Sequence, residues 1–113
     1  MLKKQNQLTK DKEFDNVFKN GKSSYDKIIG VKAITNNLDN SRFGILISTK
    51  ISKKAVERNK LKRQIREVIR LDLDLIKSGY DLVIISLVPI LDKTYEEIEK
   101  SIHSHFKKLK LYK

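Results

Sequence analysis

The segment from Lys53 to Arg70, KKAVERNKLKRQIREVIR, concentrates cations and amides, which are the side chains that bind phosphate groups. Its acids are Glu57 and Glu67 alone. A run of charge on a helix is ordinarily a solvated face in which acids and bases are mixed. The shortage of acids, together with a formal net charge of +11 over 113 residues, indicates a polyanionic partner instead. Nucleic acid and an anionic membrane surface are the usual partners of this kind.

Side chains that could carry out catalysis unaided do not form a recognisable set. The sequence has no glycine-rich phosphate loop, no nucleophile elbow, and no Ser/His/Asp or Cys/His pattern. His103 and His105 stand two residues apart on a predicted helix, without metal-ligand partners nearby, so we expect both at the surface and no metal site. Asp72 and Asp74 have the same spacing and diverge in the same way. The sequence therefore predicts binding chemistry and no hydrolysis by the protein alone.

Composition limits the class of protein further. Cysteine is absent, which excludes a disulfide framework and a thiolate metal site and suits a reducing cytoplasm. The N-terminal MLKKQNQLTK is basic but is not followed by the apolar region of a secretory signal, and no apolar run is long enough to span a bilayer. A chain of 113 residues corresponds to one domain with one modest core. We therefore expect a single cytoplasmic domain over residues 1–113.

Three elements are predicted ahead of the basic segment. Phe14, Val17 and Phe18 follow helical spacing and predict a helix over residues 10–21 that ends at Gly21. The β-branched segments 27–35 and 42–48 predict two strands, which we expect to pair as antiparallel neighbours.

Three more elements complete the prediction. The basic segment predicts a helix with room to continue as far as Gly79. Residues 81–88 are almost continuously apolar and predict a strand covered on both faces, before Pro89. Thr94 and Glu97 predict a capping box for a final helix through Leu109. The order α-β-β-α-β-α predicts an α/β fold, a two-layer α-β sandwich around a small central sheet.

The predicted basic helix has two faces when its residues are placed at roughly 100° intervals. A broad apolar stripe that can dock on the sheet holds Leu61, Ile65, Val68, Ile69 and Ile76. A narrow stripe on the far side holds Asn59, Arg63, Arg66 and Arg70, with Lys60 at its edge. Just before the helix or in its first turn lie Lys50, Lys53 and Lys54. Cations there oppose the helix dipole, and exposed N–H groups beside lysines suit a phosphate.

The sequence allows two interpretations of the position of Arg58 and Lys62, and two of the position of Phe14 and Phe18. Arg58 projects toward the sheet, with Lys62 one turn on, so both could line a cleft between helix and sheet. In the other interpretation Arg58 extends its charge to solvent or pairs with a carboxylate such as Asp81. Phe14 and Phe18 at helical spacing suit either the core or a binding platform.

The residues Ala55, Arg58, Asn59, Lys62, Arg63 and Arg66 resemble the signature of the bacterial ribonuclease P protein subunit, A-x-x-R-N-R-x-K-R followed by another arginine. The resemblance covers nearly the whole chain. LTKDKEFDNVFKNG, RFGILISTK, GYDLVIISLVP and TYEEIEKSIHSHFKKLKLYK are similar to the family's opening helix, the strand before the signature, the last strand and the closing helix. The chain differs at Lys60, where the family has a second arginine, at Lys32, where relatives often have an aromatic residue, and at Leu87, where an arginine is common.

This resemblance implies an accessory subunit of an RNA enzyme that removes the 5′ leader from precursor tRNA. The RNA would carry out the Mg²⁺-dependent cleavage, and the protein would hold no cofactor of its own. Its partners would be the ribonuclease P RNA and precursor tRNA, with neither DNA nor membrane. The resemblance also implies a mixed sheet with a left-handed β-α-β crossover, against the right-handed default.

The resemblance assigns the site residues to two sets, none of them catalytic and none binding metal. Contact with the catalytic RNA falls to Lys53, Lys54, Arg58, Asn59, Lys60, Lys62, Arg63, Arg66 and Arg70. A cleft for the single-stranded leader would include Phe14, Phe18, Lys32 and Lys50, where the phenylalanines both pack and contact bases.

Two alternatives fit the composition. A small ribosomal protein, which binds RNA without taking part in catalysis, would have the same charge. A binder of double-stranded DNA could read base edges with Asn59 and Arg63, but no helix-turn-helix partner precedes the basic helix.

Overall fold

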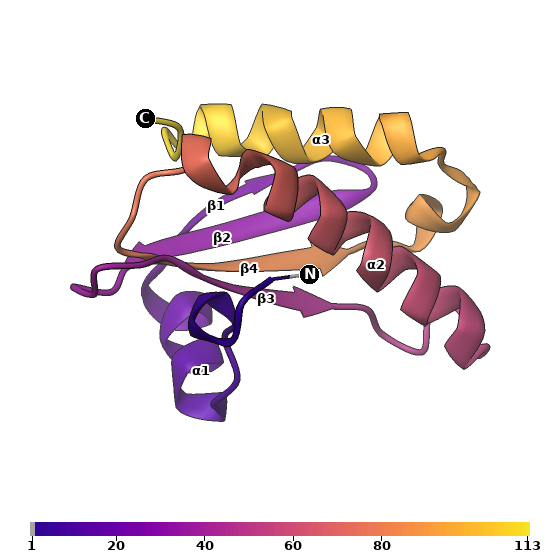
Figure 1. Ribbon diagram of the computed structural model, residues 1–113. Helices are drawn as coiled ribbons and strands as arrows, with labels where there is room; N and C mark the ends of the chain where they lie inside the picture. The colour runs from indigo at the N-terminus through magenta and orange to yellow at the C-terminus, as the bar shows by residue number, and fades with distance from the viewer. Residues whose placement is uncertain (1) are drawn as a thin grey trace.

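The computed structural model describes residues 2–113 (Figure 1). Its helices and strands are α1 (Asp11–Asn20), β1 (Lys22–Tyr25), β2 (Ile29–Thr35), β3 (Arg42–Leu46), α2 (Ala55–Asp72), β4 (Tyr80–Ser86) and α3 (Tyr95–Lys108). Short 3₁₀ turns are η1 (Lys4–Asn6), η2 (Leu73–Leu75) and η3 (Val88–Asp92). Among the described residues, no helix is both long and apolar enough to cross a membrane.

The strands form one mixed sheet in the order β1-β2-β4-β3. β2 pairs antiparallel with both β1 and β4, whereas β3 pairs parallel with β4. The prediction that segments 27–35 and 42–48 are antiparallel neighbours is therefore wrong, because β4 lies between them. The reason is burial: residues 81–84 are all buried, and such a strand is most stable at the centre of a sheet.

The predicted α/β class is confirmed, and the structure adds one strand. β1 has the polar sequence KSSY and is mostly exposed, so it carries no hydrophobic pattern and exists through its ladder with β2. In Figure 1, β3 and β4 run in the same direction, α2 lies on the near, upper side of the sheet, and β4 lies above β3. This arrangement is a left-handed β-α-β crossover, as the resemblance implies.

The core has two parts of unequal size. The main cluster lies between the sheet and the pair α2 and α3, and includes Val31, Ile84, Ile65, Ile102 and Phe106. A smaller cluster lies under α1 on the other face of the sheet, with Leu8, Val17 and Val83 at its centre. Because α1 is short, it covers only part of that second face.

Most predicted helix ends agree with the structure. Helix α1 ends before Gly21, whose N–H donates to the carbonyl of Val17 at 2.9 Å. The capping box of α3 is confirmed by the Glu97 N–H, which donates to Thr94 Oγ1 at 3.2 Å. Helix α2 does not continue to Gly79. It ends at Asp72 and is followed by η2, after which Ile76 is buried in the core.

Candidate nucleic-acid interface

Helix α2 presents its cations because its apolar stripe is turned to the sheet. Leu61, Ile65, Val68 and Ile69 are all buried, which confirms the predicted docking face. Ile76 is also buried, although it lies beyond the helix. The opposite side is exposed and holds Asn59, Lys60, Arg63 and Arg70, with Lys53 and Lys54 exposed just before the helix. Lys54 is the N-cap and its side chain makes no capping bond, so N–H groups of the first turn remain next to these lysines.

Arg70 differs from the other exposed cations of α2. Its guanidinium donates to both carboxylate oxygens of Glu67, at 3.0 and 2.6 Å. These hydrogen bonds lower the pKa of Glu67 and raise that of Arg70. Within residues 2–113, Lys60 and Arg63 make no ion pair, so their charge is uncompensated while that of Arg70 is balanced.

Arg58 is half-buried and holds the loop that precedes α2. Its Nη1 donates to the carbonyl oxygen of Ser52 at 2.8 Å. A pair between Arg58 and Asp81 is excluded, since the Asp81 carboxylate is bound to Arg42. Arg58 therefore holds the loop that carries Lys53 and Lys54. Its expected contact with the catalytic RNA stays a prediction.

Lys62 and Arg66 lie on the flank of α2 that faces the edge of β3. Both are half-buried, so Arg66 is not on the fully exposed stripe where helical spacing predicted it. They line a cavity of about 150 Å³ together with Phe14, Phe43 and Gly44 and the N-terminal residues Leu2, Gln7 and Leu8. The structure thus brings Phe14, expected to contact the leader, to the same cavity as Lys62 and Arg66, which were expected to contact the catalytic RNA.

Phe18 and Lys32 form a second pair, at the C-terminal end of α1. The Lys32 ammonium lies 5.5 Å from the centroid of the Phe18 ring and donates to the Phe18 carbonyl at 3.3 Å. Phe18 is 37% exposed, whereas Phe14 packs against the smaller core cluster. Phe18 is therefore the more exposed of the two phenylalanines, and its ring lies next to a cation. Lys50 is exposed in the loop between β3 and α2.

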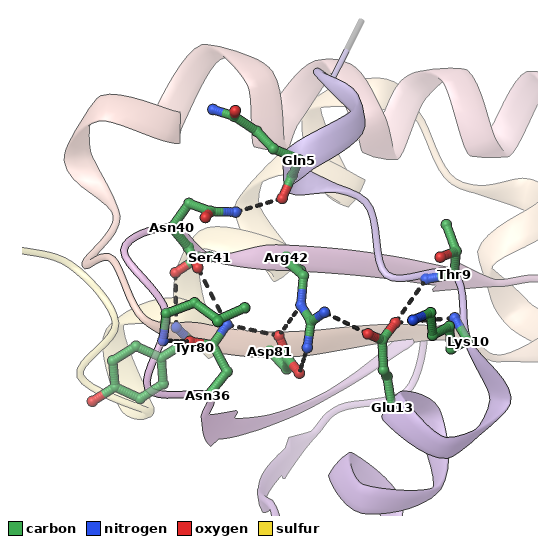
Figure 2. A network of polar contacts seen from close by, with 11 residues as sticks. Gln5, Thr9, Lys10, Glu13, Asn36, Asn40, Ser41, Arg42, Tyr80 and Asp81 are labelled. Atoms are coloured by element: carbon green, nitrogen blue, oxygen red, sulfur yellow. Dashed lines mark hydrogen bonds and ion pairs between the residues drawn. The ribbon is translucent and has the colours of Figure 1, made fainter.

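A polar network fixes α1 to the sheet (Figure 2). Arg42 on β3 donates to both oxygens of the buried Asp81 on β4, at 2.8 and 2.7 Å, and also pairs with Glu13 of α1. Asn36 donates to Asp81 at 2.8 Å. The hydrogen bonds to Asp81 raise the pKa of Arg42, which stays charged. Through Arg42, two strands and the helix that carries the phenylalanines are held as one unit.

The Glu13 carboxylate makes the network sensitive to acid. Burial by itself raises the pKa of Glu13, but the N–H groups of Lys10 and Thr9 and the Arg42 guanidinium outweigh it, so the pKa falls below its ordinary value of 4.5. A group whose folded pKa is lowered stabilises the fold above its unfolded pKa and loses that contribution as pH falls through the folded pKa.

We expect the urea midpoint to fall as pH decreases below 4.5, in part through protonation of Glu13. The matched variant Glu13→Gln has no carboxylate at this position and should lose less stability between pH 5.5 and 3.5, although it is less stable than wild type at neutral pH. The comparison is made by urea unfolding at several pH values. An equal loss in both proteins would contradict the role of Glu13.

The expected surface position of the histidines is wrong for His105, which is 1% exposed. Its Nδ1 lies 2.7 Å from Ser24 Oγ, and its Nε2 lies 3.1 Å from Asp26 Oδ2. The reason is the unpredicted strand β1, which covers this part of α3. The sequence pattern showed no Ser/His/Asp set, yet the fold assembles one from Ser24, His105 and Asp26. The buried imidazole in this set joins β1 and the residue after it to α3. His103 is half-buried, with Nε2 2.7 Å from Asp72.

The sequence analysis did not single out Arg42 or Tyr25. Arg42 begins a predicted strand and Asp81 begins another, and opposite charges at corresponding strand positions were the available signal. Tyr25 is the single aromatic residue of a polar segment, 48% exposed, and only the presence of β1 places it on the sheet.

Comparisons with known proteins agree with this geometry. A family model described as Ribonuclease P matches residues 2–110. The Ribonuclease P protein component of Clostridioides difficile strain 630 is 42% identical over 102 residues, which are 89% of each chain. The structure of the Staphylococcus aureus RNase P protein superposes with a TM-score of 0.88 at 30% identity, covering 96% of this chain and 98% of that one. The RNase P protein of Thermotoga maritima gives a TM-score of 0.79 at 30% identity, covering 87% of this chain and 92% of that one.

Proposed function

The chain belongs to the bacterial ribonuclease P protein family, a subunit of the ribonuclease P endoribonuclease, and on this premise we propose that it binds two RNAs through two surfaces. The exposed side of α2 binds the ribonuclease P RNA. The face of the sheet beside α1 binds the single-stranded 5′ leader of precursor tRNA. The protein thereby assists removal of the leader in tRNA processing in the cytoplasm.

The exposed cations of α2 support the first contact. Lys53, Lys54, Lys60 and Arg63 are exposed without ion pairs among the described residues, and the exposed Asn59 lies among them. An RNA backbone presents the phosphates that these side chains bind, and the planar guanidinium of Arg63 is suited to bind a phosphate in bidentate geometry. Lys62 and Arg66 extend the same contact toward the cavity at the edge of β3.

The ring of Phe18 beside Lys32 is the observation that carries the second contact. A single-stranded RNA is bound by a cation near its backbone and an aromatic face on which a base stacks. Phe18 supplies the aromatic ring and Lys32 the cation, and the Lys32 ammonium lies 5.5 Å from the centroid of the ring. Phe14 adds apolar surface next to Lys62 and Arg66, so a leader bound here would lie close to the contact with the catalytic RNA.

The chemistry of cleavage belongs to the RNA in this proposal. The Mg²⁺ that the family's RNA enzyme requires would act with the RNA, and the protein would hold no cofactor. The protein's residues bind, orient and neutralise phosphates. Purified protein mixed with precursor tRNA and Mg²⁺ should leave the tRNA intact, and cleavage at the mature 5′ end should begin when the ribonuclease P RNA is added. Cleavage by a nuclease-free preparation of the protein alone would contradict this.

The variant Phe18→Leu tests the leader contact. Leucine keeps most of the apolar volume but has no flat face, so we expect a loss of about 1–2 kcal/mol in the affinity of the assembled enzyme for precursor tRNA. The affinity for mature tRNA should be unchanged. The matched control is Phe106→Leu, which removes a fully buried ring and should lower the melting temperature without changing the ratio of the two affinities. Equal losses for both tRNAs would place Phe18 outside the leader contact.

A further inference from the structure

The face of the sheet that carries α1 continues beyond the helix as an open apolar row. One position from each strand lies in register across the sheet: Tyr25 pairs with Gly30, Gly30 with Ile85, and Ile85 with Leu46. Tyr25 is 48% exposed and Leu46 is 37% exposed. Ile85 is half-buried, and no described helix covers the row's outer end.

Tyr25 lies over a glycine at this row. A Cβ atom at Gly30 would stand 2.1 Å from the Tyr25 ring, so the ring occupies the space that a side chain on β2 would take. Gly30 is buried even though it has no side chain to bury, because the ring covers it. The ring therefore rests against the backbone of β2, while nearly half of the side chain remains exposed to solvent. Little conformational entropy is left to lose when a ligand stacks on such a ring.

The same arrangement occurs at the opposite edge of this face. A Cβ atom at Gly44 on β3 would stand 2.4 Å from the Phe14 ring. Gly44 pairs with Val83, and Val83 pairs with Lys32. These three residues form the row next to the row of Tyr25. Aromatic rings over glycines thus lie on both sides of Lys32. Gly30, the β2 residue of the Tyr25 row, lies two residues before Lys32, a separation of about 7 Å along the strand.

The charge of this face suits an anion. The charged residues that the strands place on it are Lys32, Arg42 and Asp81, and the last two pair with each other. Asp26, next to Tyr25, is directed to the other face, where it accepts the hydroxyl of Ser101, and it also accepts the N–H groups of Ile28 and Ile29. Lys32 is left as the uncompensated charge beside an aromatic and apolar row.

We propose that Tyr25 is an additional base-stacking residue, which takes a nucleotide of the single-stranded leader after the segment bound at Phe18 and Lys32. This inference rests on the proposed leader contact and extends it across the sheet to β1. The row would otherwise suit a second copy of the chain. A polyanionic strand fits Lys32 and the exposed Tyr25 ring better than a copy that carries the same net charge of +11.

The test uses the enzyme assembled from the ribonuclease P RNA and each protein variant, with precursor tRNAs whose leader bases are removed one position at a time. In the wild type, one abasic position should weaken binding by about five- to tenfold through loss of the stack on Tyr25. In Tyr25→Leu the intact precursor should bind about five- to tenfold more weakly, and the same abasic position should have no further effect. Tyr25→Phe should behave as wild type, since it keeps the ring. Mature tRNA should bind all variants equally.

Each other outcome contradicts the inference. If Phe18→Leu shows its leader effect while Tyr25→Leu binds every precursor as wild type does, the inference fails and the leader contact stands. If neither substitution changes the ratio of the affinities for precursor and mature tRNA, the leader contact itself fails. If Tyr25→Leu changes the oligomeric state in analytical ultracentrifugation but not leader binding, the row is a contact between copies of the chain.

Discussion

Replacing Arg42 with methionine should lower the free energy of unfolding by about 3 kcal/mol, the low end of the range for removal of one partner from a buried ion pair. The loss is large because the Asp81 carboxyl group, whose side chain is 3% exposed, would stay buried with Asn36 as its remaining side-chain donor. It is not larger because Arg42 is itself 21% exposed and partly solvated. Glu13 would lose its partner as well, and α1 would lose its polar attachment to β3.

Chemical unfolding of the variant measures this loss, and Arg70→Met is the matched control. Arg70 has the same charge and also a bidentate partner, but its pair with Glu67 is exposed on both sides. The control should therefore change the free energy of unfolding much less than Arg42→Met does. Similar losses in the two variants would show that Arg42 contributes no more than a surface ion pair.

The double variant Arg42→Met/Asp81→Leu separates the cost of an unpaired carboxylate from the value of the pair. Replacement of both partners by apolar residues of similar size should recover part of the stability that Arg42→Met loses. Since Arg42 also holds α1, and α1 carries Phe18, the folded Arg42→Met protein should bind the leader more weakly too.

Removal of two cations from α2 should have the largest effect on RNA binding. We expect Lys60→Ala/Arg63→Ala to bind the ribonuclease P RNA about 100-fold more weakly, from about 1.5 kcal/mol for each charged hydrogen bond to phosphate. The slope of log affinity against log salt should fall by about two. The melting temperature should barely change, because both side chains are exposed and alanine favours helix.

The control for that variant removes the same charge elsewhere. Lys107 and Lys108 are exposed at the end of α3, so Lys107→Ala/Lys108→Ala lowers the net charge equally without touching α2. Filter binding over a range of salt concentrations compares the two. If both double variants lose the same affinity, the RNA responds to overall charge and α2 is not the contact surface.

Patterns that depend on local spacing predicted the elements well. The apolar stripe of α2, the capping box of α3 and the buried strand β4 all follow from residues close in sequence. Strand β1 could not be predicted, because KSSY has no apolar alternation and forms a strand only when β2 is beside it. The burial of His105 and the place of Tyr25 depend on β1 and were missed for the same reason.

Contacts between distant residues account for the other differences. Arg58 and Arg42 were equally plausible partners for Asp81 by charge, and only the register of β3 against β4, which pairs Arg42 with Asp81, decides between them. The placement of β4 between β2 and β3 is likewise a property of the whole sheet. The family assignment, rather than composition, removes the alternative of a small ribosomal protein.

We propose that this protein contacts the leader as well as the catalytic RNA. The most direct measurement of this contact is the ratio of affinities for precursor and mature tRNA, taken with the ribonuclease P RNA alone and again with the protein bound. A protein that contacts the leader should raise the affinity for precursor tRNA and leave that for mature tRNA nearly unchanged, so that the ratio increases and returns toward the RNA-only value as the leader is shortened. An equal rise in both affinities, independent of leader length, would contradict a contact between the protein and the leader.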